Sequence, residues 1–190
     1  MTRKKRYETV SPPLPVEKWN HEAGFFRFGL PLGWHSLTVS ERKRLIGFQE
    51  SEVVLTGASN LVTEGPYLCM YVIGVTSLVG QQEIQEFEYM LTHPDRLLRH
   101  KTGYFGGRPL AQPARILLGG NRALVIQYTA RTNGFGFGCG SDTINTGRSD
   151  VFTLAWGRPL VITYHGMLEQ HQQCLPEFFT MLGTWEWRSA

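Results

Sequence analysis

The chain has 190 residues, which suits one domain and is too short for two well-filled domains joined by a linker. Hydrophobic residues make up 42% of it and charged residues only 18%, a composition that excludes disorder of the whole chain and supplies ample material for a core. The net charge of +3 is concentrated in short basic runs, so the overall charge assigns no particular partner.

Residues 1–22 are predicted to form an arm and residues 23–190 a single domain. The start of the arm is basic: Arg3, Lys4, Lys5 and Arg6. The proline-containing segment at residues 11–15 favours an extended backbone and resists helix. The basic run, like a second one at residues 42–44, is a candidate site for phosphates or an anionic membrane surface, while solvation alone also explains both runs.

The domain is expected to begin with a strand at residues 25–28. Thr38 and Glu41 then form a capping box, which predicts a short helix after it. Two segments rich in β-branched and aromatic residues, at 52–56 and 67–76, predict strands.

Residues 81–100 change period and predict an amphipathic helix, in which Pro94 introduces a kink or separates two successive helices. A hairpin is predicted after it, with strands at 114–118 and 123–129. The turn between these strands contains a Gly-Gly pair, which allows the positive φ values that a tight turn requires.

A second pair of strands is predicted at residues 151–156 and 160–165. The last helix is expected at residues 170–182, with Gly183 as its C-terminal cap and a short closing strand at 185–187. Helices that are segregated from an antiparallel sheet define the α+β class, so we expect an antiparallel sheet with helices packed on it.

Several segments of the chain resemble the PsbP-like fold, an α/β sandwich. They are residues 26–34, 107–109, 120–128, 161–165 and 175–179, which include a Pro-Leu-Gly-Trp sequence after the first strand and a strand rich in Thr and Tyr. The group includes extrinsic photosystem proteins, a Ran-binding import factor, the DcrB-like bacterial proteins and related chaperones of type VI secretion effectors.

The resemblance implies a non-enzymatic protein that binds a partner, and it transfers no catalytic residues. The chain departs from the group in its N-terminal extension and in a glycine-rich insert at residues 131–150. These departures leave the partner undefined, because a shared fold does not determine a function.

The insert alternates glycine with Phe135, Phe137 and Cys139. Apolar side chains on a flexible loop are unfavourable in water, so they either contact a partner or fold back on the sheet. We therefore predict a partner-binding surface that contains Phe135, Phe137, Trp156 and Tyr164.

No residue pattern indicates a catalytic centre, a cofactor site or a metal site. The glycines of the insert lack the Lys that follows them in a phosphate-binding loop. Cys139 is a candidate nucleophile only if a His and an acid approach it in the fold, and a small apolar filler is the alternative. His171 and Cys174 lie three residues apart, but a structural zinc site needs four ligands, so we expect a surface His beside a partly buried Cys.

The three cysteines are odd in number and widely spaced, which is typical of free thiols in a reducing compartment. The sequence contains no apolar segment long enough for a membrane helix, and its basic start is not followed by the apolar region of a signal peptide. We expect a cytoplasmic protein without membrane insertion.

These observations rank three functions. The first is a non-enzymatic protein-binding adaptor or chaperone, itself a candidate homo-oligomer, that uses one sheet face and the loop at 131–150. The second is binding of nucleic acid or an anionic surface through the N-terminal basic residues. The third is a small thiol-dependent enzyme that uses Cys139.

Overall fold

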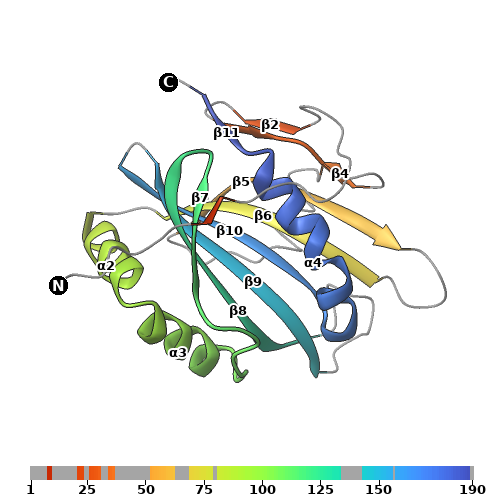
Figure 1. Cartoon of the computed structure of the whole chain (residues 1–190). Helices are drawn as coiled ribbons and strands as arrows, with labels where there is room; N and C mark the ends of the chain where they lie inside the picture. Colours follow the sequence, from red (N-terminus) through yellow and green to blue (C-terminus); the bar gives the residue numbers. More distant parts are fainter. Residues whose placement is uncertain are drawn as a thin grey trace.

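An eight-stranded sheet with helices on both of its faces organises the computed structural model of the chain (Figure 1). The structure describes residues 8–9, 21–23, 26–30, 34–36, 52–62, 69–78, 81–133, 143–155 and 157–188. The strands of this sheet are β1 (Glu8–Thr9), β4 (His35–Ser36), β5 (Glu52–Val62), β6 (Cys69–Leu78), β7 (Ala114–Leu118), β8 (Asn121–Asn133), β9 (Thr143–Ala155) and β10 (Arg158–Met167). Their order is β1-β7-β8-β9-β10-β6-β5-β4. The β1–β7 pair is parallel and the other neighbouring pairs are antiparallel.

In the described part of the chain, three helices pack on this sheet: α2 (Gln81–Thr92), α3 (Pro94–Tyr104) and α4 (Leu168–Gly183). Pro94 stands at the first position of α3, where its missing N–H is not needed, so the predicted break produces two successive helices. The α+β class, with an antiparallel sheet and helices packed on it, is confirmed by this arrangement.

Two apolar cores lie on opposite faces of the sheet, because successive side chains of a strand point to opposite faces. On one face α4 packs on Val125, Val151 and Ile162. On the other face α2 and α3 pack on Leu124, Ile126 and other neighbours of the same strands. Strands β8, β9 and β10 are therefore buried on both sides, which explains why their sequences are rich in β-branched and aromatic residues.

A small sheet closes the structure at the two ends of the chain. Its strands are β2 (His21–Ala23), β3 (Phe26–Phe28) and β11 (Glu186–Trp187), in the order β11-β3-β2. Phe26 and Phe28 stack on Trp185 with ring centroids 4.7 and 5.0 Å away. Arg27 forms an ion pair with Glu186 at 2.7 Å. These contacts hold β3, near the start of the domain, against residues 185–186, near its end.

The strands are longer than the sequence patterns predict, and one prediction is wrong as a result. The segment at 131–150 is not a long insert, because residues 131–133 belong to β8 and residues 143–150 to β9, and the two strands stay paired over this length. Polar residues and glycine interrupt the apolar alternation there, which hid the strands. Of this segment, residues 134–142 lie outside the described part of the chain.

Of the predictions made for turns and helix caps, one is confirmed and one is wrong. The hairpin turn is confirmed, with φ values of 53° at Gly119 and 88° at Gly120. Gly183 is not the cap of the last helix: it is the final helical residue, and Thr184 caps the helix with a φ of −96°. The predicted helix after Thr38 lies outside the described residues. From the predicted arm, β1 joins the large sheet and part of β2 joins the small one.

The apolar core beneath α4 depends on Phe178, whose side chain is fully buried and stacks on Tyr164 at 5.1 Å between ring centroids. We expect Phe178→Ala to lower the free energy of unfolding by about 3–5 kcal/mol, because it leaves a cavity in a packed core. The neighbouring Phe179 is only partly buried, so Phe179→Ala is the matched control and should cost clearly less. Urea unfolding of both variants measures the difference, and equal losses would contradict this packing.

Candidate functional site

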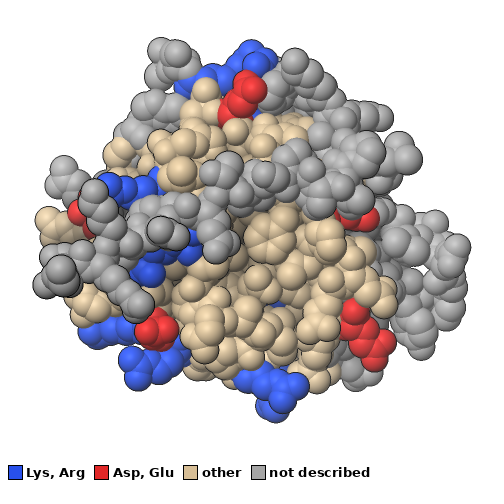
Figure 2. Space-filling view, viewed as in Figure 1, with Lys and Arg blue, Asp and Glu red and all other residues tan. Residues whose placement is uncertain are grey.

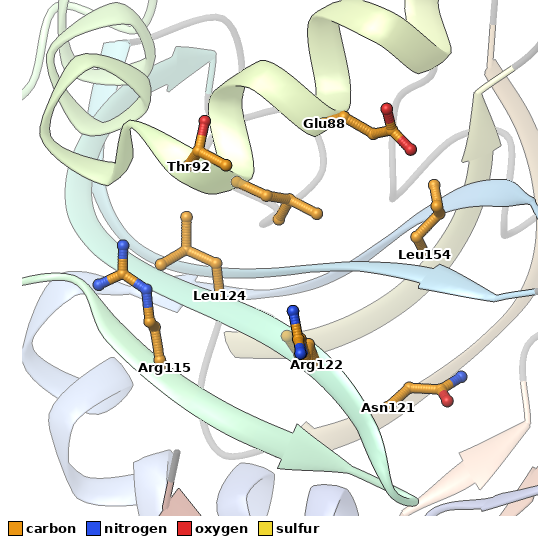
Figure 3. A pocket seen from close by; sticks show the side chains of 9 residues that line it. Glu88, Thr92, Arg115, Asn121, Arg122, Leu124 and Leu154 are labelled. Atoms are coloured by element: carbon orange, nitrogen blue, oxygen red, sulfur yellow. The ribbon is translucent and has the colours of Figure 1, made fainter. Parts of the chain in front are cut away.

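A groove lies between α2 and the β7–β8 hairpin and has a volume of about 580 Å³. We call it the α2 groove; its lining residues are Glu88, Leu91, Thr92, Arg115, Asn121, Arg122, Ala123, Leu124 and Leu154. Figure 3 shows Glu88 and Thr92 extending from the helix and Arg115, Arg122 and Asn121 from the hairpin opposite. Helix and hairpin thus form the two walls of the groove.

The base of the α2 groove is apolar. Leu91 comes from α2, Leu124 from β8 and Leu154 from β9, so three elements contribute to one apolar surface. Cavities of a few hundred cubic ångströms with an apolar lining and a few polar groups are the usual form of ligand sites in proteins. The α2 groove has this form.

The register of the hairpin determines which side of the sheet carries the charged groups of the α2 groove. Arg115 lies level with Leu124, and Leu117 lies level with Arg122, so all four side chains belong to the same face of the sheet. Among the described residues that line the groove, Arg115 and Arg122 lie on the hairpin wall and Glu88 lies on the helix wall. A guanidinium group binds a carboxylate with two parallel hydrogen bonds, so Arg115 on this wall suits an acidic group of a ligand.

A buried polar network lies further along the same face of the sheet. Asp150 on β9 is fully buried, and its carboxylate accepts hydrogen bonds from Tyr128 (2.6 Å) and Thr163 (3.0 Å). Arg148 pairs with the same carboxylate at 3.2 Å, and its guanidinium lies 4.6 Å from the centre of the Phe105 ring. The network joins β8, β9 and β10 and packs against the end of α3.

The Asp150 carboxylate remains ionised although it is buried. Burial by itself would raise the pKa of Asp150, but the charges of Arg148 and Lys101 and the hydrogen bonds from Tyr128 and Thr163 outweigh it and hold this pKa below its ordinary value. Burial and the adjacent carboxylate raise the pKa of the Tyr128 hydroxyl. At neutral pH the Asp150 carboxylate is therefore a charged acceptor and the Tyr128 hydroxyl a protonated donor. The network that they form stabilises the fold.

His171 on α4 lies in the opposite core, against Ser149 of β9. Its Nε2 is 3.0 Å from the Ser149 Oγ, and its ring stacks on Tyr164 at 4.9 Å. Burial lowers the pKa of His171 to about 4, so the ring is neutral at pH 7. A nucleophilic Ser–His pair needs a third group that orients the other ring nitrogen, and Nδ1 of His171 has no hydrogen-bond partner among the residues that the structure describes. The contact therefore serves packing: Gly147 lies so close to the ring that a Cβ at this position would overlap it.

Two residues occupy places that the sequence analysis did not expect. The prediction that Tyr164 contacts a partner is wrong for the folded chain, because its side chain is fully buried between His171 and Phe178. His171 is not a surface residue either, since it is fully buried, while Cys174 is half-buried as expected. Both errors arose because a periodic pattern does not show which side of an element faces a second layer.

The other residues singled out from the sequence lie outside the described part of the chain. They are Arg3, Lys4, Lys5, Arg6, Phe135, Phe137, Cys139 and Trp156, and their roles stay predictions. In the chain, residues 134–142 connect β8 to β9, and Trp156 follows the other end of β9.

Within the described residues, no group of three or more His, Cys, Asp or Glu side chains is arranged to hold a metal ion. None of the described helices is long and apolar enough to span a membrane.

The α2 groove is not predicted by the sequence. Arg115 lies level with Leu124 and Arg122 lies level with Leu117 across the Gly-Gly turn, and this register indicates that both arginine side chains share a face of the hairpin. The opposite wall is supplied by Glu88 and Thr92, which are more than twenty positions earlier in the chain. No local pattern brings these two segments together.

Removal of the Asp150 charge should destabilise the fold, because it leaves Arg148 paired with a neutral group in a largely buried site. We expect Asp150→Asn to lower the free energy of unfolding by about 3 kcal/mol. Asp95→Asn is the matched control, since Asp95 is exposed in the first turn of α3 and should contribute less than about 1 kcal/mol. Guanidinium unfolding curves compare the two variants, and a neutral effect of Asp150→Asn would show that the pair is not needed.

The buried His171 should make stability depend on pH. The free energy of unfolding is expected to fall as pH decreases from about 6.5 to about 4, because the unfolded histidine takes up a proton in this range and the folded one does not. The expected contribution is on the order of 3 kcal/mol and is fully present above pH 6.5. His171→Gln keeps a hydrogen-bonding side chain without this titration, so its stability should decline less steeply; parallel curves for both proteins would exclude the effect.

Comparisons with known proteins identify similar folds without assigning a family. No family model matches the chain, and no curated protein is significantly similar to it. Among solved structures, LpqN, which is involved in cell envelope biogenesis of Mycobacterium tuberculosis, is 13% identical, with a TM-score of 0.49 and coverage of 92% of this chain and 90% of LpqN. PA94 from Pseudomonas aeruginosa, a protein of unknown function, is 16% identical, with a TM-score of 0.47 and coverage of 73% of this chain and 84% of PA94.

A third similar structure is CyanoP from Synechocystis sp. PCC 6803, a cyanobacterial PsbP and so a member of the group that the sequence resembles. It is 10% identical, with a TM-score of 0.44 and coverage of 85% of this chain and 86% of CyanoP. At such low identities and TM-scores, these similarities assign neither a family nor a function, and kinship with DcrB-like proteins or secretion chaperones stays a prediction.

Proposed function

We propose that the chain is a non-catalytic protein-binding module and that a segment of its partner lies in the α2 groove. One observation carries the proposal: an open groove of about 580 Å³ combines an apolar base with two arginines on one wall. Arginine is one of the residue types that are enriched among the few residues that dominate the binding energy of protein interfaces. The proposal keeps the adaptor or chaperone function expected from the sequence and moves its site to described residues.

A polypeptide segment suits the α2 groove better than a uniformly apolar or uniformly charged ligand. The side chains of a polypeptide change between apolar and charged over short distances. The groove changes in the same way, with leucines at its base and charged groups on its walls. An acidic side chain would bind Arg115, and an apolar neighbour would cover Leu124. Glu88 would repel a second acidic group on the helix side, which adds selectivity.

The loop at residues 134–142, with Phe135 and Phe137, remains a candidate second contact. It follows the end of β8 opposite to the Gly-Gly turn, so it would engage a different part of the partner from the α2 groove. Nucleic-acid binding through residues 3–6 and thiol chemistry at Cys139 stay as alternatives, and both involve residues outside the described part of the chain.

Photo-crosslinking in native cells tests the proposal. With p-benzoylphenylalanine in place of Asn121, which lines the α2 groove, we expect the intact chain to be crosslinked to a defined protein partner. Arg115→Glu should reduce this product by about tenfold or more, since it replaces a charge-assisted contact with repulsion. The matched control is Arg99→Glu, the same charge reversal at an exposed position on α3, which should leave the product unchanged.

A second crosslinking position provides the negative control. Arg108 is exposed and lies next to Thr129, towards the far end of β8, so p-benzoylphenylalanine there should not capture the same partner. Equal capture at positions 108 and 121, or full capture by a folded Arg115→Glu variant, would exclude the α2 groove as the binding site.

A further inference from the structure

A second, smaller pocket lies where α2 meets α3 and has a volume of about 300 Å³. We call it the α2–α3 pocket; the described residues that line it are Tyr89, Met90, His93, Arg96, Leu97 and His100. At 3.6 residues per turn, Tyr89 and Met90 lie on roughly the opposite side of α2 from Glu88, Leu91 and Thr92, which line the α2 groove. The two pockets are therefore separate sites.

The polar groups of the α2–α3 pocket form a stripe. His93, Arg96 and His100 follow one another at spacings of three and four residues, so their side chains lie along one side of α3. All three are exposed, whereas Leu97 is buried and Met90 is partly buried, so the apolar groups form the base of the pocket. Among the described residues that line it there is no Asp or Glu. This combination suits a small anion that carries an apolar body.

Tyr89 holds the guanidinium of Arg96 in position. The guanidinium carbon lies 5.4 Å from the centre of the Tyr89 ring, and Nη1 of Arg96 donates a hydrogen bond to the Tyr89 hydroxyl at 2.9 Å. Within the described part of the chain, Nε and Nη2 of Arg96 have no hydrogen-bond partner. These two N–H groups form one edge of the guanidinium, which binds two oxygens of an anion side by side.

The ring of His93 is fixed as well. It stacks on Tyr89 with ring centroids 4.1 Å apart, and its Nδ1 lies 2.9 Å from the Tyr89 carbonyl oxygen. A carbonyl oxygen only accepts hydrogen bonds, so Nδ1 carries the ring hydrogen. In the neutral ring Nε2 therefore carries a lone pair, and it binds a ligand oxygen that brings a proton with it.

We propose that the α2–α3 pocket binds the phosphate group of a small phosphate monoester, whose apolar body lies on Met90 and Leu97. A phosphate monoester loses its second proton at about pH 6, so near neutral pH one of its oxygens shares a proton with Nε2 of His93. The other oxygens accept hydrogen bonds from Nε and Nη2 of Arg96. A carboxylate or a sulfate monoester brings no proton at this pH and satisfies Arg96 alone. The inference goes beyond the proposed function and does not rest on it.

A metal ion suits the same side chains less well. His93 and His100 are seven residues apart, which corresponds to about 10 Å along a helix, too far for both rings to bind one ion at about 2 Å. The described residues also contain no group of three or more His, Cys, Asp or Glu side chains that could hold a metal. An anion that contacts Arg96 and the nearby His93 does not require the two histidines to converge.

Titration calorimetry of the full chain at pH 7 with two small esters tests the proposal. Phenyl phosphate is the probe, and phenyl sulfate has nearly the same shape without an exchangeable proton. We expect phenyl phosphate to bind about tenfold or more tightly than phenyl sulfate, because only the phosphate satisfies both Arg96 and His93. Failure of phenyl phosphate to bind at millimolar concentration would overturn the site.

His93→Phe separates the shared proton from the greater charge of the phosphate. The variant keeps a ring that stacks on Tyr89 and removes Nε2, so the preference for phenyl phosphate over phenyl sulfate should fall to about threefold or less. A preference that stays at its original size would show that charge alone produces it and would overturn the role of His93.

Arg96→Gln should weaken the binding of both esters by about tenfold or more, because it removes the charged pair of donors. Arg99→Gln is the matched control, since Arg99 is also exposed on α3 but does not line the pocket, and it should leave both affinities unchanged. Equal losses in the two variants would indicate general attraction of anions to α3 and would overturn the pocket. Arg115→Glu, which tests the α2 groove, should not alter the binding of phenyl phosphate, so the two proposals fail separately.

A short phosphotyrosine peptide distinguishes a free monoester from a phosphorylated protein. A pocket of about 300 Å³ is at the small end of the range for ligand sites, so residues beside the phosphotyrosine should add no affinity over phenyl phosphate. A peptide that binds tenfold more tightly than phenyl phosphate, and loses this affinity in Arg96→Gln, would assign the pocket to a phosphoprotein and overturn the small ligand.

Discussion

Asp150 connects the three central strands of the sheet. Thr163 of β10 lies level with it and donates a hydrogen bond, Tyr128 of β8 donates another, and Arg148 on the same strand neutralises the charge. A buried carboxylate without such partners costs several kcal/mol, so any pairing of the strands that separates these groups is strongly disfavoured. The shift of one residue between β8 and β9 would turn the side chains of one strand to the opposite face and break the network.

The positions of the functional groups follow from this register. With β8 fixed, Leu124 and Ile126 face α2 and α3, whereas Ala123 and Val125 face α4. The Gly-Gly turn carries the same alternation into β7, so Arg115 and Arg122 lie on the helix side that carries Glu88. After a one-residue slip the two arginines would instead lie among Ile116, Leu118 and the aromatic core, where their charges would be unpaired. The hydrogen-bond network around Asp150 thus fixes the strand register that places Arg115 and Arg122 in the α2 groove.

The central strands are paired over long stretches and covered by apolar cores on both faces. The α2 groove lies on one of these faces, between α2 and the β7–β8 hairpin. Figure 2 shows that Lys and Arg side chains are spread over several parts of the visible face and do not gather in one basic surface there.

The sequence by itself determined the elements that depend on local chemistry. The break at Pro94 follows from its missing N–H, the turn at Gly119 and Gly120 from their positive φ, and the α+β class from the change of period between strands and helices. The tertiary structure alone decided which face of each element is buried: it placed Tyr164 and His171 in the core, continued β8 and β9 into a segment that lacks apolar alternation, and brought Glu88 opposite Arg115. These outcomes depend on contacts between residues far apart in the chain, and no window of neighbouring residues contains that information.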